Sequence, residues 1–405
     1  MELSVIVVNY NVRYFLRICL ESLHAATAGM ESEIIVVDNA SSDGSVDMIR
    51  NQFPAVDLIV NTENTGFGRA CNDALARASG RYVLFINPDT VVGESLLTEA
   101  IKNFESDDQT GAVGVCLLDG NGQVLRESKR SIPSLWSSFT KFSGLSDVFK
   151  NIPFFNGYYF PTLRYDETGD IDVLPGAFML IRKKVLDDIG GFDPRFFMYA
   201  EDIDLSYRIT RAGYRIRYVG SLHVIHFKGE STQKDLSSYT TTFYQSMRLF
   251  IQKYTGELYT PFVAGLLQGI VRGIENMQKV QRRMRRPQRK HRKQGLAECL
   301  FVLSNGDQLT SVLNKSARQV VQIPEEGHGK APFYLRYLPS YLHAHRNSAL
   351  VVDFRSLTFD RIVEIWKQER TSPFYVADSD HSFIISSHNK ENQGEVYVFD
   401  RTGEH

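Results

Sequence analysis

The fold is decided by the stretch VLPGAFMLIRKKVLDDIGGFDPRFFMYAEDIDLSYRITRAGYRIRYV, residues 173–219. Its pattern predicts a buried apolar strand, a helix, an aromatic loop and the acidic start of a second helix, in one continuous unit. The acids Glu201, Asp202 and Asp204 fall within four positions. Carboxylates next to aromatic side chains, such as those of the preceding loop, are suited to take a proton from a hydroxyl group. The alternative is that they are only first-turn acids at the positive end of a helix.

Length and composition are typical of a globular protein with two or three domains. The chain has 405 residues, of which 43% are hydrophobic and 23% charged, and its formal net charge is −1. The chain as a whole therefore lacks the net positive charge that would attract it to nucleic acid. The cysteines lack metal-type spacing, which favours structural thiols in a reducing compartment over disulfides; they are Cys19, Cys71, Cys116 and Cys299.

The amino-terminal segment enters the apolar run 4–8 at once, without a basic region or a cleavage site before it. We therefore expect no signal peptide. No window offers the roughly 20 apolar residues that a membrane-spanning helix needs. These two observations predict a cytoplasmic protein, which could still bind the inner face of the membrane as a peripheral protein.

The first half of the chain alternates short β-rich runs with helical patterns. Such alternation predicts an α/β fold with a mainly parallel sheet covered by helices on both faces. The expected strands are 3–8, 33–37, 57–61 and 82–87, and the expected helices are 12–25, 46–53 and 68–78. Ligands of such sheets bind at the carboxyl ends of the strands. Polar clusters follow all four strands, at residues 9–11, 38–45, 61–69 and 87–90.

The second half contains a long irregular excursion, 128–165, and a helical pattern at 237–254. Beyond it we predict an amphipathic and polybasic membrane-docking linker, 258–294, between a first domain, 1–257, and a small α/β domain, 295–405. Eight lysines and arginines lie between Arg282 and Lys293. In the last domain the expected helix is 358–369, and the expected strands are 299–303, 319–323, 349–354 and 374–377.

Three of the polar clusters contain side chains that are suited to bind a ligand. Asp38 could accept the ring N–H of uracil or thymine, although an Asx turn that caps the next helix would look the same. The glycine loop 64–68 lets backbone approach a ligand, and Arg69 could reach a phosphate. Asp89 is a suitable ligand for Mg²⁺ or Mn²⁺, unless Pro88 and Asp89 only stop the strand.

The run HVIH, residues 223–226, reads as a strand. We expect its two imidazoles, His223 and His226, to share one face and to offer a second metal ligand. A buried, hydrogen-bonded structural histidine is the alternative.

Six motifs, taken together, resemble those of the family 2 inverting glycosyltransferases of the GT-A fold. They are VIVVNYN, VVDNASSDGS, NTGFGRACN, FINPDT, PGAFMLIRKKVLDDIGGFDPRFFMYAEDIDLSYR and HVIHFKGES, in that order. The greatest likeness is to the bacterial rhamnosyltransferase-like branch, which builds cell-surface polysaccharides. The resemblance covers roughly residues 1–255.

The resemblance implies a nucleotide-sugar donor, dTDP- or UDP-linked, and a membrane-anchored, lipid-linked glycan as the acceptor. The base would contact Tyr10, Asp38 and Asn39, and the ribose and diphosphate would lie near Asn64, Gly66 and Arg69. The full donor-binding set would also include Asn11 and Asn87.

For catalysis, the resemblance implies that Asp202 is the general base, with Glu201 as the first alternative. The acceptor pocket would be lined by Gly176, Ala177 and Phe178. A divalent cation, Mg²⁺ or Mn²⁺, would bind Asp89 and His226. The family's DxD metal motif reads Asn87-Pro88-Asp89 here, so that its first carboxylate is replaced by an amide.

Two other functions are compatible with parts of the sequence. The replacement by Asn87 would suit a non-catalytic, membrane-associated scaffold with a degenerate fold, although Asp89, Asp202 and His226 are all retained. The basic run 282–293 could neutralise nucleic-acid phosphates. It lacks interleaved aromatics and a known nucleic-acid module, and it follows an amphipathic stretch, so we expect an anionic membrane surface as its partner and no nucleic acid.

Overall fold

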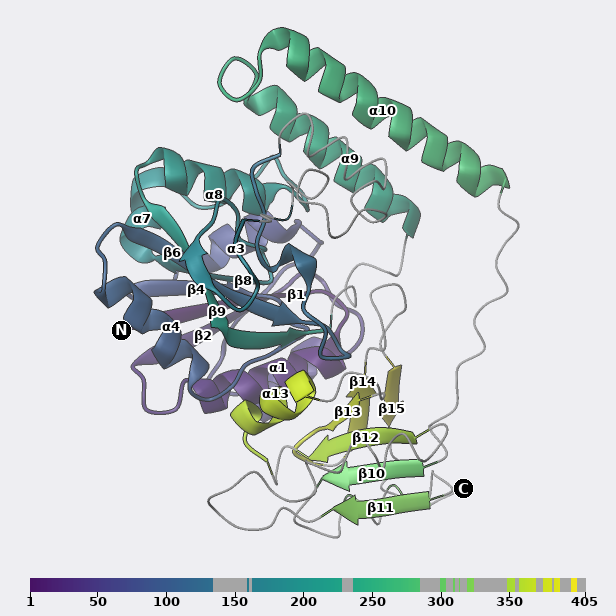
Figure 1. Ribbon diagram of the computed structural model, residues 1–405. Coiled ribbons are helices and arrows are strands. Elements are labelled where there is room, and N and C mark those ends of the chain that lie inside the picture. Colours follow the sequence, from purple (N-terminus) through teal and green to yellow (C-terminus); the bar gives the residue numbers. More distant parts are fainter. Residues whose placement is uncertain are drawn as a thin grey trace.

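The computed structural model contains a nine-stranded sheet and a separate six-stranded sheet (Figure 1). It describes residues 1–133, 159, 162–227, 236–284, 299–303, 309, 313, 319–323, 348–353, 357–368, 374–380, 382–386 and 395–398. Most of the predicted excursion and most of the basic run lie outside these residues.

The nine-stranded sheet follows the order β3-β2-β1-β4-β8-β6-β9-β5, and β7 pairs with β9. Its first four strands are parallel, and β8 is antiparallel to both β4 and β6. The strands are β1 (Leu3–Asn9), β2 (Ser32–Asp38), β3 (Asp57–Val60), β4 (Tyr82–Ile86), β5 (Thr90–Val91), β6 (Thr110–Leu118), β7 (Thr168–Asp170), β8 (Phe178–Arg182) and β9 (Arg215–His226).

Helices cover both faces of this sheet because its strands are apolar on both faces. In β1, for example, Leu3, Val5 and Val7 belong to one apolar core, while Ile6 and Val8 belong to the core on the opposite face. The helices of this part are α1 (Arg13–Ala26), α2 (Ser45–Gln52), α3 (Phe67–Leu75), α4 (Leu96–Glu105), α7 (Lys183–Ile189) and α8 (Glu201–Arg211), with a short 3-10 helix at Arg126–Ser128.

A helical hairpin of α9 (Leu236–Lys253) and α10 (Pro261–Met284) extends this domain beyond α8 (Figure 1). One face of α10 is buried with α9 and α8 in a separate apolar core, through Ala264, Leu267 and Val271. Arg248 of α9 also forms an ion pair with Glu275 of α10. The predicted boundary between residues 257 and 258 therefore falls inside a packed helical pair.

The six-stranded sheet follows the order β11-β10-β12-β13-β14-β15, with parallel pairing from β11 to β13. Its strands are β10 (Cys299–Leu303), β11 (Gln319–Ile323), β12 (Ser348–Asp353), β13 (Phe374–Ala377), β14 (Phe383–Ser386) and β15 (Glu395–Val398), and its helix is α13 (Phe359–Gln368). In Figure 1, α13 lies beside α1, between the two sheets.

The predicted fold class is confirmed: a mainly parallel, helix-covered sheet is joined to a smaller α/β unit. The predicted strands and helices agree with the observed ones to within a few residues at each end. The cysteines at 19, 71 and 116 are buried and form no disulfide among the described residues.

Candidate active site

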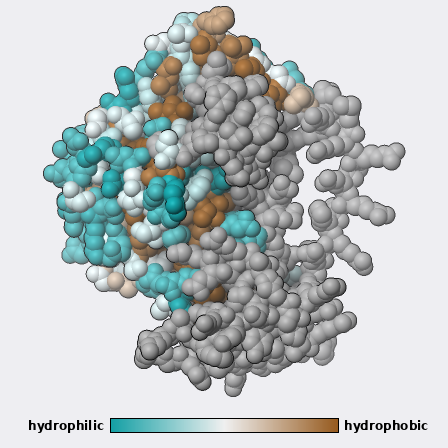
Figure 2. Space-filling model, viewed as in Figure 1, coloured by the Kyte–Doolittle hydropathy of each residue, from teal (hydrophilic) through white to brown (hydrophobic). Residues whose placement is uncertain are grey.

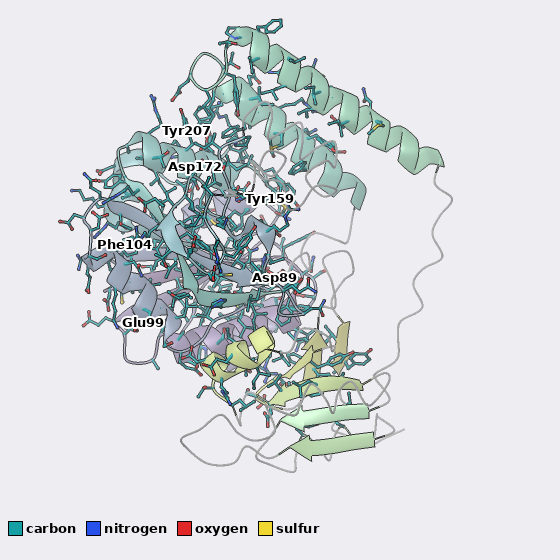
Figure 3. The ribbon with its side chains drawn as sticks, in the orientation of Figure 1. Asp89, Glu99, Phe104, Tyr159, Asp172 and Tyr207 are labelled. Carbon is teal, nitrogen blue, oxygen red and sulfur yellow. The ribbon has the colours of Figure 1, made fainter. Side chains whose placement is uncertain are left out.

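The carboxyl ends of the first four strands meet at one edge of the nine-stranded sheet, as predicted. Figure 3 shows Asp89 at this edge, whereas Glu99 and Phe104 of α4 lie toward the opposite end of the strands. Because β1 and β2 are in register from Leu3 to Asn9, the last residue of β1 lies beside Asp38.

Asp38 is completely buried and is held in place by neutral donors. The side-chain amide of Asn9 donates to Asp38 Oδ2 at 2.7 Å, and the backbone N–H of Ser41 donates to Oδ1 at 2.8 Å. A carboxylate has about four acceptor positions, so Asp38 retains capacity for a ligand N–H. Sequence reasoning did not single out Asn9, whose role follows only from the strand register.

Asn39 ties the end of β2 to the glycine loop. Its amide donates to the carbonyl of Gly66 at 3.2 Å, and its Oδ1 accepts from Asn61 at 2.8 Å and from Thr65 at 3.2 Å. The side chain is buried and shapes the loop.

The turn after β1 carries Tyr10, which is partly exposed, and Asn11, which has a positive φ of 56°. The backbone N–H of Asn11 donates to the hydroxyl of Ser41, and its Oδ1 accepts from the N–H of Ser42. The turn after β1 and the turn after β2 are thereby fixed to each other.

The glycine loop packs against the loop that precedes α8. Gly66 has a φ of 86°, and a Cβ there would stand 2.4 Å from the carbonyl oxygen of Phe197, so only glycine fits. Asn64 accepts from the N–H of Gly66 at 3.0 Å. Arg69 Nε donates to the carbonyl of Pro194 at 3.2 Å at an exposed position. The loop thus connects the donor-side cluster with the loop before Glu201.

The predicted metal motif and His226 come together. Asp89 Oδ1 lies 3.3 Å from His226 Nε2. The side-chain nitrogen of Asn87, Nδ2, lies 3.3 Å from the same ring atom. Asp89 and His226 are both buried. Neighbouring ligands of an octahedral ion, bonded at about 2.1 Å, stand about 3 Å apart, so this pair fits a divalent cation. No third His, Cys, Asp or Glu completes the group among the described residues.

The prediction that His223 shares a face with His226 is wrong. The two residues lie three positions apart in the continuous strand β9, and side chains of a strand alternate between its faces.

The acidic pair begins α8, directly after two non-glycine residues with positive φ, Tyr199 (70°) and Ala200 (63°). Asp202 Oδ2 accepts from the guanidinium of Arg130 and from the N–H of Gly176 at 3.1 Å. Asp202 Oδ1 accepts from the N–H of Ile203 at 2.8 Å. A carboxylate oxygen has two lone pairs, so Oδ1 retains one acceptor position.

Glu201 lies in a different environment from its neighbour. It is buried, and its Oε2 has no hydrogen-bond partner among the described residues. Burial, with the nearby charge of Asp202, raises the pKa of Glu201 to about 8. Glu201 is therefore protonated at neutral pH, whereas its neighbour Asp202 is paired with the guanidinium of Arg130.

Asp204, the third acid, is structural. It is completely buried and binds Arg208 at 2.9 Å, Lys253 at 2.5 Å and the hydroxyl of Tyr254 at 2.7 Å. These contacts fasten α9 to α8.

The segment 176–178 connects the acidic pair with the metal motif. Gly176 donates to Asp202, and the carbonyl of Ala177 accepts from the N–H of Asn87 at 3.2 Å. Phe178 is completely buried in the apolar core. Arg130 is the contact that sequence reasoning missed, because it carries no motif and reaches Asp202 through the pairing of its own backbone with Val173.

Two family models match parts of this chain. The family model glycosyl transferase family 2 matches residues 4–190, and glycosyl transferase family 21 matches residues 140–252. An N-acetylglucosaminyl-diphospho-decaprenol L-rhamnosyltransferase of Mycobacterium tuberculosis is 30% identical over 260 residues, covering 62% of this chain and 83% of that protein. The rhamnosyltransferase WbbL of Escherichia coli is 31% identical over 231 residues, covering 55% and 82% respectively.

Among solved structures, a mannosyltransferase of Pyrobaculum calidifontis has a TM-score of 0.46 and 17% identity, covering 69% of this chain and 75% of that one. The sequence relatives define the class of this protein as a glycosyltransferase that uses a nucleotide-sugar. The chain belongs to glycosyl transferase family 2, in its rhamnosyltransferase-like branch.

Proposed function

We propose that the protein transfers a hexose, such as rhamnose, with inversion, from a dTDP- or UDP-sugar to a hydroxyl of a lipid-linked or surface-polysaccharide intermediate. The observation that supports this proposal is the direct connection between Asp202 and the metal motif through residues 176 and 177. The two related rhamnosyltransferases support the sugar and, for the mycobacterial protein, a lipid diphosphate acceptor.

Inversion at the anomeric carbon requires a base on the acceptor side and stabilisation of the leaving nucleoside diphosphate on the other side. Asp202 would take the proton of the acceptor hydroxyl at its remaining acceptor position on Oδ1. Arg130 and the N–H of Gly176 hold the carboxylate by its other oxygen. Glu201, protonated beside it, does not compete as a base at neutral pH.

On the donor side, Asp38 would bind the base, and Asp89 with His226 would hold a divalent cation. Such an ion neutralises the charge that develops on a leaving diphosphate. With one carboxylate and one imidazole at this position, we expect weak binding that EDTA reverses. Full activity in EDTA, unchanged by Asp89→Ala, would contradict this assignment.

The decisive experiment compares Asp202→Asn with Glu201→Gln. Asp202→Asn should lower the rate of transfer at least about 100-fold, which is a usual scale for a general base. Its donor affinity, measured by calorimetry, should stay at the wild-type value. Glu201→Gln should stay active, because the amide resembles the protonated acid. The opposite pattern would make Glu201 the base, and wild-type protein that neither transfers nor hydrolyses any nucleotide-sugar with Mn²⁺ would support the scaffold function.

We also propose that α10 and the following basic run dock the enzyme on the cytoplasmic face of the membrane. No described helix is long and apolar enough to span a bilayer. The face of α10 opposite α9 is apolar and exposed: Phe262 is 82% exposed, Leu266 47% and Met277 51%. Figure 2 shows apolar side chains gathered at this end of the molecule. An interfacial helix followed by basic residues is suited to an anionic surface.

Liposome flotation tests the docking. Binding should require anionic lipid, weaken with salt, and fail when the lysines and arginines of 282–293 become Gln, since each contributes about 1 kcal/mol near an anionic surface. Phe262→Ser should weaken binding on the same vesicles, while Val60→Ser, at an exposed apolar position on β3, serves as the matched control. Equal flotation on neutral and anionic vesicles would refute the electrostatic part of the proposal.

A further inference from the structure

The six-stranded sheet contacts the catalytic domain at two places, the first of which is an ion pair on α1. Arg17 is 8% exposed and binds Asp378 at 3.0 Å and Asp380 at 2.5 Å, in the turn after β13. Glu21, one turn further along α1, accepts from the hydroxyl of Ser379 at 2.7 Å. A charge buried to this extent requires its partners, so this contact fixes α1 against the turn.

Apolar packing surrounds the ion pair. The ring of Tyr14 packs edge-on against Phe383 at 4.8 Å between centroids, and the guanidinium of Arg17 lies over the same ring. One apolar core continues from Phe15 of α1 to Phe359 and Ile362 of α13. The two sheets therefore share a buried interface.

The second contact is a reciprocal cap between two helices. The carboxylate of Glu94 accepts from the N–H groups of Phe359 and Asp360, both at 2.7 Å, at the start of α13. In return, Asp360 accepts from the N–H of Ser95 at 3.0 Å, directly before α4. Each domain thus supplies the acceptor for N–H groups at a helix start that have no intrahelical partner. Gly93 permits this approach, because a Cβ there would stand 2.0 Å from Asp360 Oδ1.

Both contacts adjoin segments of the donor site. Helix α1 begins two residues after Asn11, and its first N–H, that of Arg13, donates to Asp43 in the cluster after β2. Gly93 follows β5 closely, and β5 continues from Asp89 and pairs with His226. The donor-site segments 10–11 and 87–89 therefore continue into α1 and into the connection between β5 and α4. Both of these elements contact the six-stranded domain.

We infer that the domain 295–405 is a brace for the donor site, with Arg17 and Asp360 as positioning residues. This inference rests on the proposed function, in which residues 10–11 and 87–89 contribute to binding of the nucleotide-sugar donor and its cation. Without the brace, these segments would sample more conformations, and the donor would have to order them on binding. The domain then acts on donor affinity and leaves the base, Asp202, unchanged.

The test uses the full chain with Arg17→Met, Gly93→Ala and Asp360→Ala, below the melting temperature of each variant. Calorimetry measures the Kd for UDP and for dTDP, each with MnCl2. We expect the Kd to rise about 5- to 20-fold in all three variants, the range of a modest coupling between sites. Arg17→Lys and Asp360→Asn should largely restore affinity, because lysine keeps the charge and asparagine also caps helices. Arg77→Met, which removes an exposed ion pair with Asp57, is the matched control.

Amide hydrogen exchange gives a second measurement that needs no ligand. Segments 9–13 and 87–95 should exchange faster in the three variants and at the wild-type rate in the control, because their local opening becomes easier. A lowered melting temperature with unchanged Kd and unchanged exchange would overturn the inference and leave the domain a stabilising role only. If the wild type binds neither nucleotide, the proposed function fails, while the exchange rates still decide whether the domain braces these segments.

Discussion

Asp38 is the last residue of β2 in the nine-stranded sheet, and Asp378 directly follows β13 in the six-stranded sheet. Both are completely buried at the carboxyl edge of a parallel sheet. Asp378 accepts from Arg17 and from the N–H groups of Ser382 at 2.6 Å and Phe383 at 2.8 Å. Asp38 accepts from the neutral groups of Asn9 and Ser41.

This difference shows what determines whether the carboxyl edge of a sheet binds a ligand or contacts another domain. A carboxylate with a buried arginine and several donors has little acceptor capacity left, and its edge becomes an interface. A carboxylate held by two neutral donors stays able to accept from a ligand. The strand pattern alone is the same in both sheets, so the partner supplied by another element makes the distinction.

The largest expected effect comes from Asp378→Ala. It leaves the buried guanidinium of Arg17 with only Asp380 and Glu21 as carboxylate partners, and it removes the acceptor of the backbone N–H groups of Asp380, Ser382 and Phe383. We expect a loss of about 3–5 kcal/mol in the free energy of unfolding, measured with urea. Asp380→Ala is the control and should cost at most about 1 kcal/mol, since that side chain is 46% exposed. A loss below about 1 kcal/mol for Asp378→Ala would show that the interface is not held by this residue.

The next effect is that of Asp38→Asn on ligand affinity. The amide keeps one acceptor oxygen but replaces a charged hydrogen-bond partner, which we expect to weaken binding of UDP and dTDP by about 1.5–3 kcal/mol. Calorimetry measures the loss, and circular dichroism checks that the fold survives. If Asp38 only caps a turn, nucleotide affinity should not change.

Glu201→Gln should alter the pH dependence of stability. The folded-state pKa of Glu201 is about 8, above its ordinary value of 4.5, so the folded protein binds this proton more tightly than the unfolded chain does. Stability should therefore fall as the pH rises from about 4.5 to 8, by at most about 1.4 kcal/mol per pH unit for this group. Glutamine carries no charge, so the variant should show a flatter profile in urea unfolding at pH 5, 6, 7 and 8. Parallel profiles would contradict the raised pKa.

The smallest effect is expected from Arg77→Ala, at an exposed ion pair far from both carboxyl edges. Arg77 is 52% exposed and binds Asp57 at 2.9 Å. Solvent and salt screen such pairs, so the cost should be about 0–1 kcal/mol in the same unfolding assay. A larger loss would mean that the measured cost of Asp378→Ala is not specific to buried partners.

Local periodicity was sufficient for most elements, including β10, β11 and β13 of the second sheet, which lie where the pattern predicts them. It was also sufficient to place the polar clusters after the strands. It did not reveal Arg130, whose link to Asp202 spans 72 positions and depends on one isolated backbone bridge. Periodicity alone does not distinguish Asp204 from Asp202. In the structure, Asp204 fastens α9 to α8, whereas Asp202 contacts Gly176 in the segment that leads to the metal motif.

The sequence by itself determined the alternation of strands and helices, the family and the positions of the polar turns, because apolar periodicity and motif order are properties of neighbouring residues. Only the tertiary structure decided which buried carboxylate meets an arginine, which of two adjacent acids is protonated, and that α4 and α13 cap each other. These outcomes depend on groups far apart in the chain. Burial and the charge of a distant partner set the energy of an ionised side chain, and neither is present until the chain has folded.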